Sequence, residues 1–140
     1  MKVLFICKYN KGRSQIACAM FNRISKKHAG VSAGIHVADD LEKSGRLPNK
    51  TVIEVMKEIG YDISKNKRTQ LTRSIADKAD KIIAVMSKKE ADALPSYVTS
   101  SKKFVLWGIK RDKRVEFTRA IRQVRNRIHV KVKELVKETG

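Results

Sequence analysis

A cysteine and an arginine near the start of the chain are side chains suited to chemistry on a tetrahedral oxyanion. Cys7 ends the apolar run Val3–Ile6, and Arg13 follows after five residues that include Gly12. Backbone N–H groups at a turn that leads into a helix bind anions, and they would stabilise a thiolate as readily. The planar guanidinium of Arg13 matches two oxygens of an oxyanion at once. The pair predicts a nucleophilic thiolate in an anion-binding loop, against the alternative that Cys7 is an inert core residue.

The elements that would position this pair are apolar strands that alternate with helices. An amphipathic helix is expected from about Arg13 to Lys27, and Gly30 is expected to end it. Strands are expected over residues 3–7, 31–37, 81–86 and 103–107. This alternation predicts an α/β fold, a four-stranded parallel sheet with helices on both faces. Ligands of such sheets bind at the carboxyl ends of the strands, where Cys7 would lie.

The rest of the chain is expected to form short helices, loops and one long final helix. The polar segment 39–49 predicts a loop. The final helix has apolar residues at helical spacing from Phe117 to Leu135, and its basic residues, Arg125 among them, are expected to face solvent. Further helices are expected over residues 51–59, from Thr72 to about 79, and from Ser87 to a point before Pro95.

Length and composition are typical of a single globular domain. The 140 residues, 41% of them hydrophobic, suffice for one core, so we predict one domain over residues 1–140. No apolar run approaches the roughly 20 residues of a membrane span, and a strand begins directly after Lys2, where a signal peptide would otherwise lie. We therefore expect a cytoplasmic protein without a membrane partner, either a monomer or a weak homodimer.

Cysteine and histidine usage argues against a disulfide framework, a metal site or a cofactor. The chain has two cysteines, Cys7 and Cys18, and three histidines, with no spacing typical of zinc ligands. Cys18 lies outside the inward-facing stripe of the first helix, and we expect a structural role for it. No metal and no cofactor are predicted.

The charge balance is strongly basic. There are 32 Lys and Arg residues against 14 Asp and Glu residues, a formal charge of +18. Such a field favours acidic partners, either phosphorylated molecules or nucleic acid, although it can also be a general property of the surface. Aromatic residues make up only 6% of the chain, which argues against stacking platforms for single strands and makes nucleic acid the less favoured partner.

The stretch Cys7–Ser14, of sequence CKYNKGRS, resembles the phosphate-binding loop of low-molecular-weight protein tyrosine phosphatases and of the arsenate reductases related to them. In that family five residues separate the cysteine from the arginine, an asparagine is third after the cysteine, and a serine follows the arginine. The final helix and three further stretches are similar to the family in the same order: Ser32-Ala33-Gly34, residues 60–72 and residues 79–86. The resemblance therefore covers essentially the whole chain.

The resemblance implies a role for each position of this loop. Cys7 would be the nucleophile, and the reaction would pass through a phosphocysteine intermediate that water then hydrolyses. Asn10 would orient the loop, and Ser14 would donate a hydrogen bond to the Cys7 sulfur and ease its departure. The implied function is hydrolysis of phosphomonoesters on proteins or small molecules. The phosphate-binding set would be Lys8, Tyr9, Asn10, Lys11, Gly12, Arg13 and Ser14, through Arg13 and the backbone N–H groups.

The family's general acid is an aspartate in the loop after the fourth strand, within the pattern Trp-x-x-x-Asp-Pro, and this chain departs from that pattern. The fourth residue after Trp107 is Arg111, and Asp112 comes one position later, followed by Lys113. Counted back from the final helix, Asp112 precedes Ile121 by nine positions, which matches the family's spacing. A one-residue insertion accounts for both counts, so Asp112 is the candidate general acid. The alternative is that Asp112 only caps the final helix.

Other departures bear on the substrate. Tyr9 stands where many of these phosphatases have glycine, and Lys8 and Lys11 make the loop more basic. Lys113-Arg114 replace the aromatic residue that often follows the Asp-Pro pair. A site walled by cations suits a polyanionic phosphate compound better than a bare phosphotyrosine ring.

Two alternative functions would use the same loop. In an arsenate reductase the Cys7 thiolate would attack arsenate. Because Met86-Ser87-Lys88-Lys89 supplies no resolving cysteine, such an enzyme would need an external small thiol. The second alternative is a catalytically weak basic module that binds nucleic acid or a phosphorylated partner, which the charge of +18 suggests.

Overall fold

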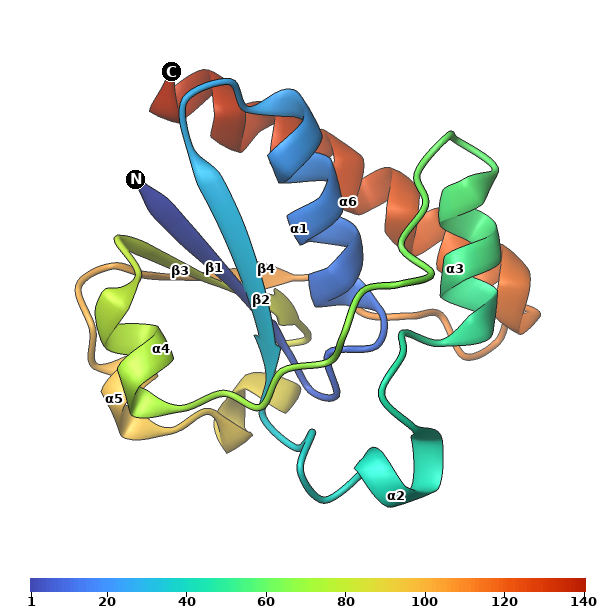
Figure 1. The fold of residues 1–140 in the computed structure, drawn as a ribbon, viewed down its shortest axis with the longest axis horizontal. Coiled ribbons are helices and arrows are strands. Elements are labelled where there is room, and N and C mark those ends of the chain that lie inside the picture. Colours follow the sequence, from blue (N-terminus) through green and yellow to red (C-terminus); the bar gives the residue numbers. More distant parts are fainter.

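The computed structural model describes residues 1–140 and contains a parallel sheet of four strands. The strands lie side by side in the order β2-β1-β3-β4, and each neighbouring pair is parallel (Figure 1). Their bounds are β1 (Lys2–Cys7), β2 (Ala29–Gly34), β3 (Lys81–Met86) and β4 (Phe104–Gly108). Cys7 at the end of β1 is paired with Gly34 at the end of β2, so the carboxyl ends of the two strands meet.

Helices cover both faces of the sheet, as predicted. One face packs against α1 (Arg13–Ile24), α3 (Lys50–Lys57) and α6 (Phe117–Thr139). The other packs against α4 (Arg73–Lys78), the 3-10 helix η1 (Glu90–Ala93) and α5 (Ser96–Thr99). The short α2 (Leu41–Ser44) lies apart from both layers (Figure 1).

The two layers explain why the strands are continuously apolar. In β1, Val3 and Phe5 belong to the core on the side of α1, while Leu4 and Ile6 belong to the core on the side of α4. A strand buried on both faces has no polar face, which is typical of parallel sheets. The predicted α/β fold is therefore confirmed. The sheet places Cys7, the last residue of β1, at the start of the loop that leads to α1.

Local capping signals account for several helix ends. The Thr72 hydroxyl accepts a hydrogen bond of 3.2 Å from the backbone N of Ile75 at the start of α4, as predicted. Gly60 follows α3 with a φ of +85°, a left-handed conformation that glycine adopts without strain, and its N–H donates to the carbonyl of Lys57.

The first helix begins at Arg13 as predicted but ends earlier than predicted, and the second strand both begins and ends earlier. α1 ends at Ile24 because Ser25 already has an extended backbone, with φ −73° and ψ 129°. Gly30 therefore does not end this helix. It lies inside β2, which begins at Ala29 and ends at Gly34 because pairing with β1 runs over that range.

Three further predictions need correction. Residues 39–49 contain the short helix α2 instead of being loop throughout, and the helix expected after Ser87 is the single 3-10 turn η1, with α5 following beyond Pro95. Arg125 of α6 is buried instead of solvated, because it donates hydrogen bonds of 2.8 Å to the Val55 carbonyl and 2.9 Å to Glu58. These bonds join α6 to α3.

None of the helices combines the length and apolar character needed to span a bilayer.

Candidate active site

The loop after β1 brings Cys7, Ser14 and Asn10 into one hydrogen-bonded chain. The Sγ atom of Cys7 lies 2.9 Å from Oγ of Ser14, which accepts a hydrogen bond of 2.7 Å from Nδ2 of Asn10. Because Asn10 supplies a proton to the hydroxyl oxygen, the hydroxyl hydrogen of Ser14 is left to point at the sulfur. All three side chains are buried, and Cys7 is only 2% exposed. Ser14 is thus arranged to donate a hydrogen bond to a thiolate.

Asn10 also fixes the shape of the loop. Its φ is +51°, the only positive value among the non-glycine residues, in a region that asparagine adopts more readily than most side chains. Its Oδ1 accepts a hydrogen bond of 2.8 Å from the backbone N of Thr69, and its carbonyl accepts one of 3.1 Å from Nε2 of Gln15. The turn at Asn10 is therefore held by a distant residue, Thr69, as well as by a nearby one, Gln15.

The N–H groups of residues 8–12 donate to no acceptor in the protein. The next three, those of Arg13, Ser14 and Gln15, belong to the first turn of α1 and have no intrahelical acceptor, because the first helical bond runs from Ile16 to the Gly12 carbonyl. A run of unpaired N–H groups at the positive end of a helix is a binding arrangement for an anion.

Arg13 is held from two sides, by Glu90 and by the carbonyl of Ile109. Nη1 donates hydrogen bonds of 2.7 Å to Oε1 of Glu90 and 2.9 Å to the Ile109 carbonyl, and Nη2 donates one of 2.7 Å to Oε2 of Glu90. Burial acts to lower the pKa of Arg13, but the bond with Glu90 and the attraction of Cys7 and Glu90 raise it above its usual value. The same bond lowers the pKa of Glu90 to about 2, so this pair is ionised near neutral pH.

Glu90 was missed by the sequence analysis, although a local signal marks it. Ser87 and Glu90 form a capping box: the backbone N of Glu90 donates to Oγ of Ser87 at 3.1 Å, and the backbone N of Ser87 donates to Oε1 of Glu90 at 3.0 Å. The spacing Ser-x-x-Glu at the end of a strand therefore indicates an ordered glutamate at the carboxyl end of the sheet.

Gly34 and Arg68 support the loop from the side of β2. A Cβ atom on Gly34 would lie 2.7 Å from the backbone N of Asn10, so the loop packs directly on the glycine backbone. The Arg68 side chain is fully buried and donates to the Tyr9 carbonyl at 2.9 Å and to Asp40 at 2.7 Å. In the sequence Arg68 follows Lys65 and Lys67, and no sequence signal distinguishes it from these two neighbours.

Asp112 lies in the loop after β4, where it is bound to Arg114. Its Oδ1 accepts hydrogen bonds of 3.0 Å from the backbone N and from Nε of Arg114, and these bonds lower its pKa. The residue that caps α6 is Glu116, which accepts hydrogen bonds from the backbone N atoms of Thr118 and Arg119. The alternative role of Asp112 as a helix cap is therefore wrong. No hydrogen bond joins Asp112 to Cys7, and its role as general acid stays a prediction.

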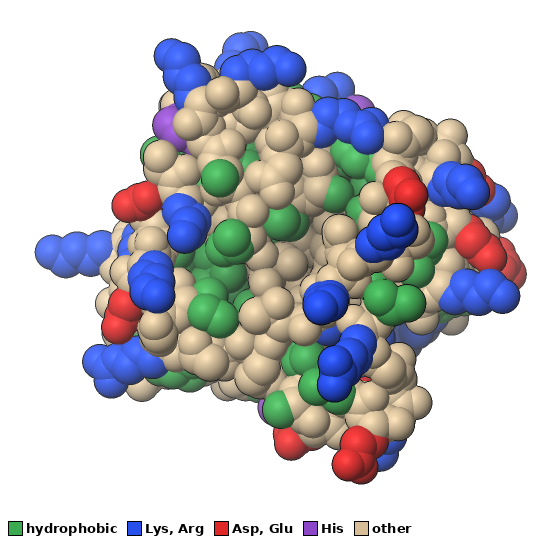
Figure 2. All heavy atoms as spheres, viewed as in Figure 1, with side chains coloured by type: hydrophobic (Ala, Val, Ile, Leu, Met, Phe, Trp, Pro, Cys, Tyr) green, Lys and Arg blue, Asp and Glu red, His purple; other side chains and the backbone are tan.

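Basic and aromatic side chains surround the loop. The Nζ atoms of Lys8 and Lys11 lie 5.2 and 5.1 Å from the centre of the Tyr9 ring, within the range of cation–π contacts. Lys11 also forms a 3.3 Å ion pair with Asp40. Elsewhere on the surface, Figure 2 shows Lys and Arg side chains spread over one face of the molecule instead of forming one continuous strip. On that face the charge does not outline a track for a nucleic acid strand.

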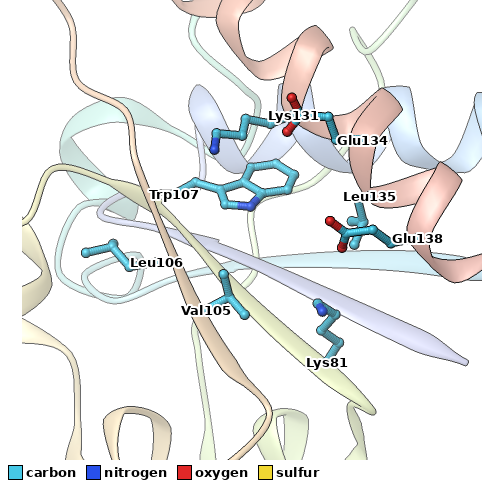
Figure 3. A pocket seen from close by; sticks show the side chains of 8 residues that line it. All are labelled: Lys81, Val105, Leu106, Trp107, Lys131, Glu134, Leu135 and Glu138. Carbon is cyan, nitrogen blue, oxygen red and sulfur yellow. The ribbon is translucent and has the colours of Figure 1, made fainter.

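Two surface hollows lie away from this loop. One, of about 240 Å³, is lined by Trp107 of β4 and Leu135 of α6 together with charged residues such as Lys81 and Glu134 (Figure 3). The other, of about 360 Å³, lies along β2 and α4. Neither is lined by a residue of the loop 7–14, so the hydrogen-bonding pattern, and not these two hollows, locates the candidate site.

Cys18 does not belong to this arrangement. It lies on α1, accepts a hydrogen bond of 3.5 Å from Nδ2 of Asn22, and is partly buried against the core. Burial raises the pKa of its thiol to about 11, so it is protonated at neutral pH. No group of three or more His, Cys, Asp and Glu residues could hold a metal ion.

Comparison with known proteins gives the family. The sequence profile described as "Low molecular weight phosphotyrosine protein phosphatase" matches residues 2–139. An arsenate reductase of Halalkalibacterium halodurans is 31% identical over 143 residues, covering 99% of this chain and 96% of that protein. A probable low molecular weight protein-tyrosine-phosphatase of Ralstonia solanacearum, EpsP, is 32% identical over 93 residues, or 65% of this chain and 61% of its own.

Solved structures share the fold over nearly the whole chain. Wzb of Vibrio vulnificus in complex with benzylphosphonate superposes with a TM-score of 0.84 and 22% identity, covering 98% of this chain and 97% of that one. An arsenate reductase of Archaeoglobus fulgidus gives a TM-score of 0.73 and 28% identity, covering 96% and 98%. The resemblance stated from the sequence is confirmed: the chain belongs to the low molecular weight phosphotyrosine protein phosphatase family, and it has the fold of a cysteine-dependent phosphatase.

Proposed function

We propose that the chain hydrolyses phosphomonoesters in two displacements at Cys7. In the first, the Cys7 sulfur bonds to phosphorus while the bond to the leaving oxygen breaks, and Asp112 gives that oxygen a proton. In the second, Asp112 takes a proton from water, the water oxygen bonds to phosphorus, and the bond from sulfur to phosphorus breaks. The observation that carries the proposal is the buried chain Cys7–Ser14–Asn10 beside unpaired N–H groups. The Ser14 hydroxyl can stabilise the thiolate, and the N–H groups can stabilise the phosphoryl oxygens.

Hydrolysis of p-nitrophenyl phosphate by the wild type and by Cys7→Ser tests the nucleophile. We expect activity in the wild type and none above background in the variant, because a hydroxyl without an adjacent base is a poor nucleophile. Activity that survives the substitution would show that another group does the chemistry.

The assignment of Asp112 is tested by the leaving group. Asp112→Asn should slow hydrolysis of an alkyl phosphate, whose leaving oxygen needs a proton, far more than hydrolysis of p-nitrophenyl phosphate, whose leaving group departs unprotonated. Asp62→Asn is the matched control, since Asp62 accepts similar hydrogen bonds from Ser64 in a turn. Equal effects of Asp112→Asn on both substrates would remove Asp112 from the mechanism.

A second candidate function, arsenate reduction, is favoured by the arsenate reductase relative at 31% identity. Here the Cys7 sulfur would bond to arsenic while one arsenate oxygen leaves as water, and an external thiol would then attack the Cys7 sulfur. Arsenic leaves as arsenite with two electrons, and a mixed disulfide forms at Cys7. The chain itself offers no resolving thiol, because Met86 ends β3 and Cys18 is protonated and bound to Asn22. Arsenate reduction dependent on added glutathione, without phosphatase activity, would replace our proposal.

The cationic surroundings of the loop support a polyanionic substrate. The ammonium groups of Lys8 and Lys11 flank Tyr9, and Lys113 and Arg114 lie on the loop that carries Asp112. We expect a higher kcat/KM on acidic phosphopeptides than on neutral phosphotyrosine peptides, with a difference that falls as salt increases. Equal values on the two series would contradict this preference.

The free thiol of Cys7, as the proposed nucleophile, also supports a location in a reducing compartment, which in most cells is the cytoplasm.

A further inference from the structure

Three of the five N–H donors of the Arg13 guanidinium are already bound to the protein. Both hydrogens of Nη1 are used, one by Oε1 of Glu90 and one by the Ile109 carbonyl. One hydrogen of Nη2 is used by Oε2 of Glu90. The two donors that remain are the N–H of Nε and the second hydrogen of Nη2, and both lie along the same edge of the planar group.

This free edge is the one that can bind two oxygens of a tetrahedral oxyanion at once. Glu90 occupies the adjacent edge of the guanidinium, between Nη1 and Nη2, so it fixes the group without covering the Nε and Nη2 edge that would bind phosphate. We propose that Glu90 is a positioning residue, which aims the Nε and Nη2 edge of Arg13 at the phosphoryl group. This inference rests on the proposed function only for the identity of the oxyanion as a phosphoryl group. The arrangement of Arg13 and Glu90 bears on the binding of an oxyanion, whether or not the oxyanion then reacts.

Glu90 is itself well placed for this task. The capping box with Ser87 fixes its backbone and one carboxylate oxygen at the end of β3. The side chains of Arg13 and Glu90 are only 19% and 27% exposed, so little water competes for their two bonds. A bidentate, shielded ion pair restricts the rotation of a long side chain, and an arginine that is already oriented loses less entropy when an anion binds.

The same contacts connect the loop after β4 with the loop after β1. Arg13 binds the Ile109 carbonyl, three residues before Asp112, while Glu90 holds the same guanidinium from the end of β3. Loss of Glu90 would therefore disturb both the oxyanion-binding edge and the start of the loop that carries the candidate acid.

The opposite role, in which Glu90 competes with phosphate for Arg13, predicts the opposite result. If the carboxylate blocked the site, its removal would strengthen oxyanion binding. If it positions the guanidinium, its removal weakens binding, because Arg13 becomes free to rotate away.

Binding of inorganic phosphate to Cys7→Ser protein, followed by titration calorimetry, separates these roles without any need for turnover. Adding Glu90→Gln should raise the Kd by about tenfold or more, as expected when a charge-assisted hydrogen-bond partner is lost. Glu90→Asp keeps the charge but shortens the side chain, and positioning predicts that it also weakens binding. Unchanged or tighter phosphate binding in Glu90→Gln, or full affinity in Glu90→Asp, would overturn the proposal.

Kinetics and a matched control complete the test. In protein that keeps the wild-type Cys7, Glu90→Gln should lower kcat/KM on p-nitrophenyl phosphate by on the order of 10²-fold, the effect of misplacing a catalytic group by about 1 Å.

Glu58→Gln is the control, because Glu58 also binds two arginines, Arg122 and Arg125, but between α3 and α6. It should leave kcat/KM and phosphate affinity within about twofold of wild type. A fall in kcat/KM after Glu58→Gln as large as after Glu90→Gln would reduce Glu90 to a merely structural contact. If the wild type itself lacks phosphatase activity, the proposed function fails while the phosphate titration still decides the role of Glu90.

Discussion

Substituting Gly34 by alanine should damage the candidate site without touching any of its side chains. Gly34 ends β2, and a Cβ atom there would lie 2.7 Å from the backbone N of Asn10 and 2.8 Å from the backbone C of Tyr9. Cβ atoms essentially never approach other atoms within 3.0 Å, and both neighbours are backbone, which cannot rotate away as a side chain can. The loop or the strand has to move.

The size of the effect follows from these separations. Widening the 2.7 Å separation to the 3.4 Å at which ordinary contact begins displaces the loop by about 0.7 Å. A misplacement of a catalytic group by about 1 Å costs on the order of 10²-fold in rate, and the proposed function makes the loop the carrier of those groups. Overpacking of this kind also costs about 1–3 kcal/mol of the free energy of unfolding. The protein should therefore fold and yet be nearly inactive.

Steady-state hydrolysis of p-nitrophenyl phosphate and thermal unfolding, measured on the same preparations, check this prediction. Gly108→Ala is the control, because nothing lies within 4 Å of a Cβ atom there and it adds the same methyl group at the end of another strand. We expect Gly108→Ala to keep kcat/KM within about twofold, the range typical of a surface substitution away from special features. A Gly34→Ala protein that keeps half or more of the wild-type kcat/KM would refute the argument that the loop rests on the glycine backbone.

Three further outcomes are expected. Ser14→Ala removes the 2.9 Å contact with the Cys7 sulfur, so the phosphocysteine intermediate should break down about tenfold more slowly. Rapid-quench measurements should then show a burst of product, and a time course without a burst would contradict this role of Ser14. Arg68→Met leaves the Tyr9 carbonyl without its buried donor and should cost about 3 kcal/mol in urea unfolding, whereas an unchanged midpoint would speak against it. The folded-state pKa of Glu90 is lowered from 4.5 to about 2, so its pairing with Arg13 stabilises the fold above pH 4.5 and is lost as pH falls toward 2. The difference in unfolding free energy between wild type and Glu90→Gln should shrink over that range, and a constant difference would exclude the linkage.

The parts of this molecule that sequence analysis could predict are those encoded locally. The run from Val3 to Cys7 is apolar at every position because both faces of β1 are buried, and such a run is visible without a structure. Cys7 and Arg13 could be paired because they lie in one short loop. The strand Lys81–Met86 was predicted with the bounds that the structure has.

Contacts between distant residues could not be predicted in the same way. Glu90 is 77 positions from Arg13, and Arg68 is 59 positions from Tyr9, so no periodicity or spacing links the members of either pair. β2 begins at Ala29-Gly30, two residues with little intrinsic preference for strands, because the edge of β1 offers them hydrogen bonds. In both cases tertiary structure decides what local preference leaves open.

The bond between Arg13 and Ile109 uses a main-chain carbonyl, which any residue at that position would supply. The loop over residues 109–116 can therefore change its side chains, and even its length, while its first residue stays attached to Arg13. Loops grafted from relatives with other substrate preferences should join this scaffold at the same point. Evolution could likewise diversify what the enzyme recognises without rebuilding the attachment, since no particular side chain is required to keep it.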